Sequence, residues 1–273
     1  MALMPIFGAP ALHLPCALAQ LSPRLMTLTD ADEALAFRRQ VLLAMPPALR
    51  VNDEAHTVAP AVERHWVQTH LGSRAWTLGV WDDQLLVALA CLQLADADDP
   101  DDAVHLVGMP AAQRARTAHL ALCLVHEDYR GMHLQAKLLN WRREIARARG
   151  RTLLVAMTAC GNTYSRRNLL AAGLGIHWIG ERRPGHWWYA MAQDLSPQAP
   201  LPADRDHEWV DLDNLARQVD LLDDGFVCVA ETAWLGGEHD PLPRLQYVRR
   251  PFNPLRPGGT AARENQPNRE CAT

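Results

Sequence analysis

The sequence predicts an α/β protein of the α+β type, with a central, mixed, twisted sheet of about seven strands flanked by about four helices and followed by a C-terminal extension. Three observations predict this class. Apolar runs of strand length alternate with amphipathic stretches of helix length from residue 24 onward. Two of the runs, 118–125 and 152–159, are almost continuously apolar, as in strands that are buried on both faces. The stretch 75–95 has the pattern of a β-hairpin.

Composition limits the possible partners. The chain has 273 residues, of which 48% are hydrophobic, enough for one large core or two small ones. Its formal net charge is only -4, and Lys137 is the single lysine among 27 basic residues. Because no basic block is present, nucleic acid is not expected as a partner. No run reaches the roughly 18 uncharged apolar residues that span a bilayer, so no membrane partner is expected either.

The N-terminus and the cysteines indicate a cytoplasmic protein. Residues 1–20 are apolar but contain no Lys or Arg ahead of a run interrupted by proline, whereas a secretory signal normally begins with cations. The six cysteines include no C-x-x-C pair, and Cys91, Cys123 and Cys228 lie in apolar runs where free cysteine acts as a small hydrophobe. This usage favours a reducing compartment, and no cluster of Cys and His indicates a metal site.

The first half of the chain alternates helix and strand signals. We expect a strand over 24–28, a helix over 29–45, a second helix over 59–71 and a hairpin over 75–95 that turns at Asp82-Asp83. The first helix begins at Thr29 or Asp30 and stops at Pro46-Pro47. The aspartate-rich segment 96–102 lacks the glycine and the spaced ligands of a calcium loop, so it is interpreted as a solvated loop.

The second half contains a strand, a helix and a second strand between 118 and 159. This order predicts two parallel strands joined by a right-handed crossover, with the helix beginning near Arg130-Gly131 and ending at Gly150. The remaining elements are a helix over 162–173 and strands over 176–182 and 186–195. We divide the chain into an N-terminal arm (1–23), a main domain (24–195), a C-terminal extension (196–252) with a helix over 211–223 and strands over 226–231 and 245–250, and a tail (253–273) that is expected to be disordered.

Arg130-Gly131 stands where a helix begins, directly after a buried strand. A helix start presents unpaired backbone N–H groups and the positive end of the helix dipole, which together bind anions. Glycine lets the backbone approach a phosphate closely, and arginine adds a forked, permanently charged donor. Neither the G-x-G-x-x-G of a dinucleotide fold nor the G-K-[ST] of a P-loop is present. On these residues alone, an ordinary glycine with a solvated arginine is the alternative.

Two longer motifs give this position a context. The stretch "LCLVHEDYRGMHLQAKLL" (122–139) resembles the acetyl-CoA segment of the GCN5-related N-acetyltransferase (GNAT) family, and "NTYSRRNLLAAGL" (162–174) resembles the segment that follows it there. Each motif alone is weakly specific, but the two occur in the right order and spacing. The resemblance covers residues 24–195 and implies the GNAT fold.

The resemblance also implies a site for acetyl-CoA. Cys123, Leu124 and Val125 would offer backbone hydrogen bonds to the pantetheine arm, and Asn162 and Ser165 would lie beside the thioester, although helix capping is the alternative for Ser165. The pyrophosphate would rest on the segment made of Arg130, Gly131, Met132, His133, Leu134, Gln135, Ala136 and Lys137.

The sequence departs from the family pattern at four positions. His133 and Gln135 stand where the phosphate segment commonly has further glycines. Leu169 replaces the tyrosine that often donates a proton, and Met157 replaces a glutamate that sometimes acts as base. The usual acid–base groups therefore cannot be carried over to this chain.

Acetyl transfer to an amine needs a base for the ammonium, a donor for the oxyanion and a proton for the thiolate. A backbone N–H near Val125 could serve the oxyanion, and His126, Glu127 and Tyr164 are the nearest titratable candidates for catalytic roles, with packing or surface positions as the alternative for each. A covalent intermediate on Cys160 is disfavoured, because direct transfer is the habit of the family.

The acceptor is expected to be a small molecule with an amine, or an amino-acid-like compound. It would enter beside 46–57 and 181–186, where Arg50, Arg182 and Arg183 could receive a carboxylate and Asp53 and Glu54 an amine, unless these are solvated loop charges. The alternatives are an acyltransferase that uses longer acyl-CoA or acyl carrier protein, and a non-catalytic CoA-binding module. The C-terminal extension could close over the pocket or form a homodimer.

Overall fold

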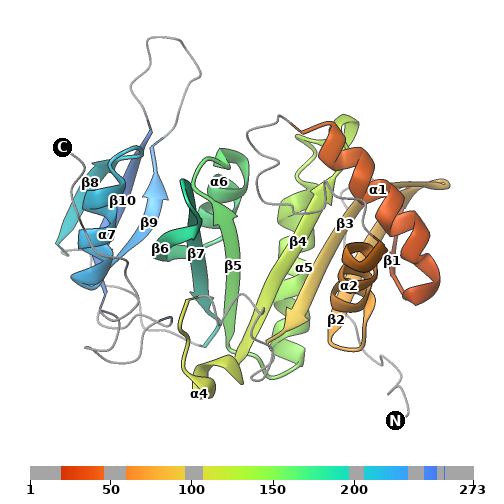
Figure 1. Ribbon diagram of the computed structural model, residues 1–273, viewed down its shortest axis with the longest axis horizontal. Helices are drawn as coiled ribbons and strands as arrows, with labels where there is room; N and C mark the ends of the chain where they lie inside the picture. The colour runs from red at the N-terminus through yellow and green to blue at the C-terminus, as the bar shows by residue number, and fades with distance from the viewer. Residues whose placement is uncertain are drawn as a thin grey trace.

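The computed structural model describes residues 20–45, 60–95, 107–196, 206–232, 243–250 and 255, apart from the side chain of Arg183. The described residues form one ten-stranded sheet in the order β1-β2-β3-β4-β5-β7-β6-β9-β10-β8 (Figure 1). The strands are β1 Leu21–Leu25, β2 Ala75–Asp82, β3 Leu85–Leu94, β4 Thr117–Val125, β5 Leu153–Ala159, β6 Gly175–Arg183, β7 His186–Asp194, β8 His207–Asp211, β9 Phe226–Glu231 and β10 Arg244–Arg249.

Six α-helices and two 3-10 turns connect the strands within the described residues. The helices are α1 Ala31–Leu43, α2 Pro60–Leu71, α4 Ala111–Arg114, α5 Leu134–Ala148, α6 Thr163–Ala171 and α7 Leu215–Asp223, and the 3-10 turns are η2 Leu28–Asp30 and η5 Glu127–Tyr129. The mixed α/β class is confirmed. The expected count of about seven strands is too low, because β8, β9 and β10 of the C-terminal extension continue the same sheet.

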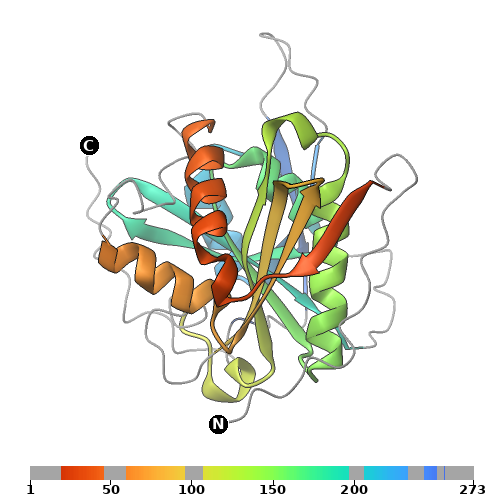
Figure 2. The ribbon, with the colours of Figure 1, turned by 90° about the vertical axis from the view of Figure 1, so that its right-hand side faces the viewer.

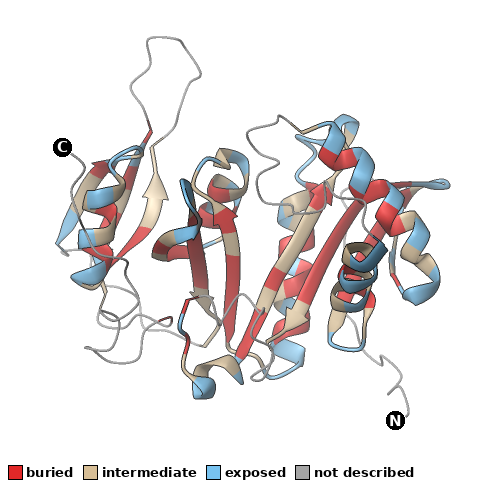
Figure 3. Cartoon of the chain, viewed as in Figure 1, coloured by how far each residue is buried: buried red, intermediate tan, exposed pale blue. Residues whose placement is uncertain are grey.

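The sheet lies between two layers of helices (Figure 2). On one face, α1 and α2 bury Phe37 and Trp66 against Leu89 and Leu124 of the strands. On the other face, apolar side chains of α5, α6 and α7 join the largest core cluster, for example Leu138. The central strands are therefore buried along most of their length (Figure 3).

Local sequence signals explain most element boundaries. Thr27 and Asp30 form a capping box at η2, directly ahead of α1. Thr27 was expected in a strand over 24–28, but because it caps a helix, β1 ends at Leu25. The hairpin turns at Asp83, whose φ is +52°, between β2 and β3. Gly150 and Gly173 end α5 and α6 with φ of +68° and +86°, the left-handed conformation that glycine adopts without strain.

The C-terminal extension contains one strand that was not expected. β8, "HEWVD", lies at the edge of the sheet and pairs antiparallel with β10, whereas the sequence analysis assigned no element to 207–210 and began a helix at 211. The helix expected over 211–223 begins later, at Leu215, because Asn214 caps it by accepting a hydrogen bond from the backbone N–H of Arg217.

Several expectations fall on residues outside the described part of the chain. They concern most of the N-terminal arm, the loops 46–57 and 96–102, and the tail 253–273, of which Leu255 is described and is buried against Leu153 and Val155. Among the described helices, none combines the length and the apolar character needed to cross a bilayer.

Candidate functional site

Strands β4 and β5 run parallel, as expected, but they separate after a short paired stretch. They pair only at Thr117–Leu153, Ala118–Leu154 and His119–Val155. Beyond these pairs β4 remains with β3 and β5 with β7, so the two strands diverge (Figure 1). We call the space between residues 120–125 and 156–159 the split. Among the described strands, none pairs with the facing edges of β4 and β5 there.

The two edges of β4 can be told apart by its pairing with β3. The N–H of His126 donates to the carbonyl of Val87 at 2.9 Å, and bonding toward the partner alternates along an antiparallel pair. Leu124 therefore directs its N–H and C=O toward β3, whereas Cys123 and Val125 direct theirs into the split. Of the three strand residues expected to bind pantetheine, the geometry suits Cys123 and Val125 but not the backbone of Leu124.

A buried arginine, which the sequence analysis did not single out, supports β4 where the split begins. The register against β3 shifts between Cys91–Leu122 and Gln93–His119, so β4 carries one extra residue there. From α5, Arg142 Nη1 donates to the carbonyls of Leu122 at 2.9 Å and Cys91 at 3.3 Å. The side chain is only 2% exposed, and burial lowers its pKa. Its hydrogen bonds hold the irregular strand in place.

The split leads to the N-terminus of α5. Arg130, Gly131, Met132 and His133 are exposed there, and the helix proper begins at Leu134. Gly131 has φ of +78° and His133 φ of +59°, so this segment bends through two left-handed residues. Among the described residues, no side chain makes a capping hydrogen bond at the start of α5, which suits its first backbone N–H groups to an anion.

The N-terminus of α6 borders the same region. Asn162 caps this helix, its Oδ1 accepting a hydrogen bond from the backbone N–H of Ser165 at 3.1 Å. Further along α6, the side chain of Asn168 donates to Gln135 Oε1 in the first turn of α5, so α6 contacts the start of α5. Gln135 and Lys137 are partly buried and Ala136 is exposed. The structure thus places both predicted segments at one mouth of the split.

The three candidate acid–base residues do not form a constellation. His126 is held by neighbours: its Nδ1 accepts from the N–H of Asp128 at 3.3 Å and its Nε2 lies 3.0 Å from Gln40 Nε2 of α1. Glu127 is exposed on η5, and Tyr164 is 77% exposed on α6. Across the described residues, no hydrogen bond or ion pair joins any two of the three.

The two residues that replace acid–base groups of the family pattern, Leu169 and Met157, pack with the core. Leu169 is 5% exposed in the main cluster, and Met157 packs beside Val155. Cys160 lies at the end of β5, and burial raises the pKa of its thiol to about 12. A thiol with such a pKa is protonated at neutral pH and is a poor nucleophile, which agrees with direct transfer.

A scan against protein-family models finds no match, and neither does a search of curated proteins. Solved structures do match. A protein from Acinetobacter baylyi ADP1, provisionally described as an acetyltransferase, gives a TM-score of 0.50 at 16% identity, covering 67% of this chain and 98% of its own. The ribosomal-protein-alanine N-acetyltransferase of Brucella melitensis gives 0.48 at 17% identity, covering 64% and 99%. The ribosomal-protein-S18-alanine N-acetyltransferase of Escherichia coli gives 0.47 at 15% identity, covering 67% and 99%.

The chain has the GNAT fold. Identities this low establish the fold and leave the reaction open. The GNAT fold expected from the two motifs is therefore confirmed, and about a third of this chain lies beyond what the Acinetobacter protein matches, since the coverage is 67%.

The structure places few of the residues expected to receive an acceptor. Arg50, Asp53 and Glu54 lie outside the described residues, and the side chain of Arg183 is not described. Arg182 lies over the ring of Trp188, with its guanidinium carbon 4.8 Å from the ring centroid. Within the described part of this GNAT fold, no group of three or more His, Cys, Asp or Glu residues could hold a metal ion.

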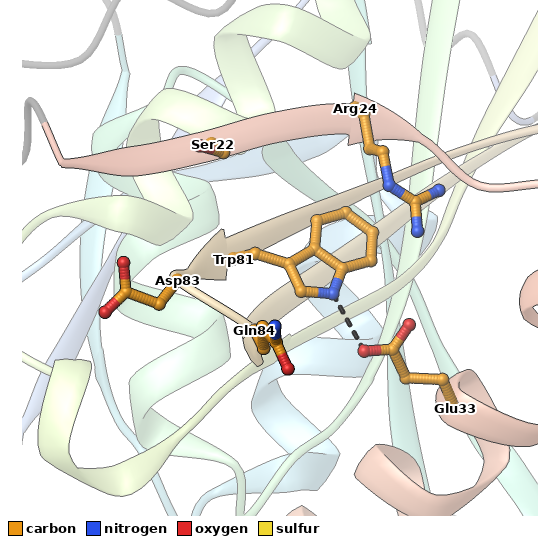
Figure 4. A pocket seen from close by; sticks show the side chains of 6 residues that line it. All are labelled: Ser22, Arg24, Glu33, Trp81, Asp83 and Gln84. Carbon is orange, nitrogen blue, oxygen red and sulfur yellow. Dashed lines mark hydrogen bonds between the residues drawn. The ribbon is translucent and has the colours of Figure 1, made fainter.

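A separate hollow lies at the β1 edge of the GNAT fold, lined by Ser22, Arg24, Glu33, Trp81, Asp83 and Gln84 (Figure 4). The side chains of Arg24, Glu33 and Trp81 in this hollow make hydrogen bonds, a stacking contact or an ion pair with one another or with Asp30. Trp81 Nε1 donates to Glu33 Oε1 at 2.8 Å, and Arg24 stacks over Trp81 at 4.0 Å while pairing with Asp30 at 2.8 Å. Because its main charges are already engaged, we place the candidate site in the split.

Proposed function

We propose that the protein is an acetyl-CoA-dependent N-acetyltransferase that acts on the amine of a small molecule or amino-acid-like acceptor. The observation that carries this proposal is the split itself: an unpaired edge of β4 runs toward an uncapped helix N-terminus that bears Arg130 and Gly131. A strand edge can bind an amide-containing arm, and the helix start can bind its phosphates. The GNAT fold supports the same assignment.

The residues at the split fit such a coenzyme. Cys123 and Val125 would hold the pantetheine arm through their backbone groups, as another strand would. The N–H groups of Leu134 and Gln135 would receive the pyrophosphate, with Arg130 as a charged donor. Asn162 uses its Oδ1 as a cap, which leaves its Nδ2 to donate to a carbonyl of the arm. When bound, acetyl-CoA supplies a thioester as acyl donor.

The acceptor ammonium can lose its proton by one of two routes. Either Glu127 accepts the ammonium proton through water, or the amine arrives already deprotonated and no side chain is needed. We favour the second route, because His126 is held by Gln40 and Asp128, and Glu127 and Tyr164 are exposed. A backbone N–H near Val125 would stabilise the oxyanion in both.

Isothermal titration with acetyl-CoA tests the proposal, with desulfo-CoA and free pantetheine as partial ligands. Saturable binding together with CoA release on addition of an amine panel supports it. Absence of binding up to millimolar concentration would refute it. Comparing acetyl with octanoyl donors separates acetyl transfer from transfer of longer chains, and binding without CoA release would indicate a non-catalytic module instead.

Variants of the candidate residues separate the two proton routes. If Glu127 acts as a base, Glu127→Gln lowers kcat about 100-fold or more at neutral pH. If the amine arrives deprotonated, Glu127→Gln, His126→Ala and Tyr164→Phe each leave the shape of the pH–rate profile unchanged. We expect the second result.

A further inference from the structure

A carboxylate of the C-terminal extension reaches the helix that begins at the split. Glu231, the last residue of β9, is only 3% exposed in its side chain, and Arg166 of α6 is 0% exposed. Arg166 donates from Nε to Glu231 Oε2 at 2.8 Å and from Nη2 to Oε1 at 3.1 Å. Arg167 Nε adds a third hydrogen bond to Oε1 at 3.0 Å. The pair is thus bidentate, buried and joined by a second cation.

The same guanidinium continues to the turn between β5 and α6. Arg166 Nη1 donates to the carbonyl oxygen of Cys160, and Nη2 lies 3.4 Å from the hydroxyl of Thr163. This turn contains Asn162, which caps α6 and borders the split. A continuous chain of hydrogen bonds therefore runs from β9 through Arg166 to the residues that frame Asn162.

The burial of this pair distinguishes it from the other ion pairs of the extension. Glu208 and Arg217 form equally short hydrogen bonds, 2.7 and 2.6 Å, but both side chains are about 40% exposed, at 38% and 41%. Solvent screens exposed pairs, so their geometry has little influence on their surroundings. In a buried pair, loss of one partner leaves an uncompensated charge, so the position of Arg166 depends on Glu231.

We propose that Glu231 is a positioning residue for the coenzyme site: through Arg166 it fixes the 160–163 turn so that Asn162 faces the split. The inference rests on the proposed function, in which Asn162 donates to the pantetheine arm. A positioned donor contributes to binding only when supporting side chains hold it in one place. The extension thereby completes the site, although it lies beyond the domain expected over 24–195.

The experiment compares Glu231→Gln with Glu208→Gln in the full-length chain. Amide hydrogen exchange over residues 161–166, measured without ligand, should accelerate at least about tenfold in Glu231→Gln, which weakens a charged hydrogen bond, and stay unchanged in Glu208→Gln. Titration with CoA should then give a Kd at least about tenfold higher for Glu231→Gln, with Glu208→Gln close to the wild type.

A double variant covers the case in which Glu231→Gln does not fold. Arg166→Met combined with Glu231→Leu removes both charges together, which buried pairs often tolerate, while still removing the contact with Cys160. It should fold, exchange faster over 161–166 and bind CoA more weakly. Unchanged exchange in either folded variant, or faster exchange with unchanged CoA affinity, would overturn the inference. If the wild type binds no CoA, the proposed function fails, and the exchange result still decides whether Glu231 holds the turn.

Discussion

Arg142 Nη1 donates a 2.9 Å hydrogen bond to the backbone carbonyl of Leu122, from a helix on one face of the sheet to a strand within it. Leu122 borders the split and lies three residues after His119, the last residue of β4 that pairs with β5. The contact ties α5, whose N-terminus would bind phosphate, to the strand that would bind the rest of the coenzyme. Both halves of the candidate site therefore depend on one buried side chain.

Replacing Arg142 by lysine should lower the free energy of unfolding. An ammonium group has no fork and cannot reach the carbonyls of Cys91, Leu122 and Leu138 together, so at least one hydrogen bond from a charged donor is lost, which costs about 1.5–3 kcal/mol. Urea unfolding measures the change. Arg147→Lys, at the exposed end of the same helix, is the control and should stay within about 0.5 kcal/mol of wild type. Equal effects of the two variants would show that Arg142 carries no such role.

The two buried tyrosines of the C-terminal half should be coupled energetically through one glutamine. Tyr189 and Tyr247 both donate to Gln218 Oε1, at 2.9 and 3.1 Å. Tyr189→Phe or Tyr247→Phe alone should cost about 1 kcal/mol, because the oxygen keeps one donor. The double variant leaves that buried oxygen without either, and should cost about 1 kcal/mol more than the sum. Additive losses in a double-mutant cycle would contradict the shared acceptor.

Stability should fall in mild acid because of His70. Burial lowers the pKa of this side chain to about 4, with lesser contributions from His119, Arg38 and His65. A histidine whose folded pKa is depressed binds its proton more readily when unfolded, so its stabilising effect is present above about pH 6.5 and is lost as pH falls toward 4. The loss is at most about 3.4 kcal/mol, at about 1.36 kcal/mol per unit of pKa. His70→Asn, whose amide can still donate to the carbonyl of Trp66, should lose less stability over this range in urea titrations, and parallel curves would disprove the assignment.

Arg130, at the helix start beside the split, should contribute to acetyl-CoA binding and little to stability. Arg130→Ala should weaken acetyl-CoA binding by about 1.5–3 kcal/mol, the range for a hydrogen bond to a charged group, with little change in Tm because the side chain is exposed. Arg147→Ala removes the same charge from the other end of α5 and should leave the affinity nearly unchanged. Calorimetric titration of both variants makes the comparison, and a matching loss of stability and affinity in Arg130→Ala would make this residue structural instead.

Local signals in the sequence predicted most elements. The aspartates at the hairpin, Gly150 and Gly173 each mark a backbone conformation that few residues adopt, and the structure has turns or helix ends at all of them. Strand β8 was missed because five residues in a polar context carry no clear alternation, and β1 was shifted because Thr27 caps a helix. Whether such a short segment forms a strand, and where that strand ends, depends on the strand it pairs with in the folded sheet.

The site was predictable in outline only. Arg130-Gly131 and Asn162 stand at helix starts as their sequence context indicated, but the alternation that separates Leu124 from Cys123 and Val125 depends on the register with β3. Arg142 could have been noticed, since it falls on the same helical stripe as Leu138, Leu139 and Ile145. The pair between Arg166 and Glu231 joins positions 65 residues apart, and no local pattern indicates it.

The short pairing between β4 and β5 also gives the molecule a mechanical property. Four strands lie on one side of the split and six on the other, and only three residue pairs join the two sets within the sheet. From His119 to Val125, β4 extends about 20 Å beyond the last pair, at about 3.3 Å per residue. A rotation of about 5° at that junction would move the tip of the strand by about 2 Å at this lever length. The three strands of the extension join this sheet through the single pair Ile176–Cys228, so a second short junction lies on the same side of the split.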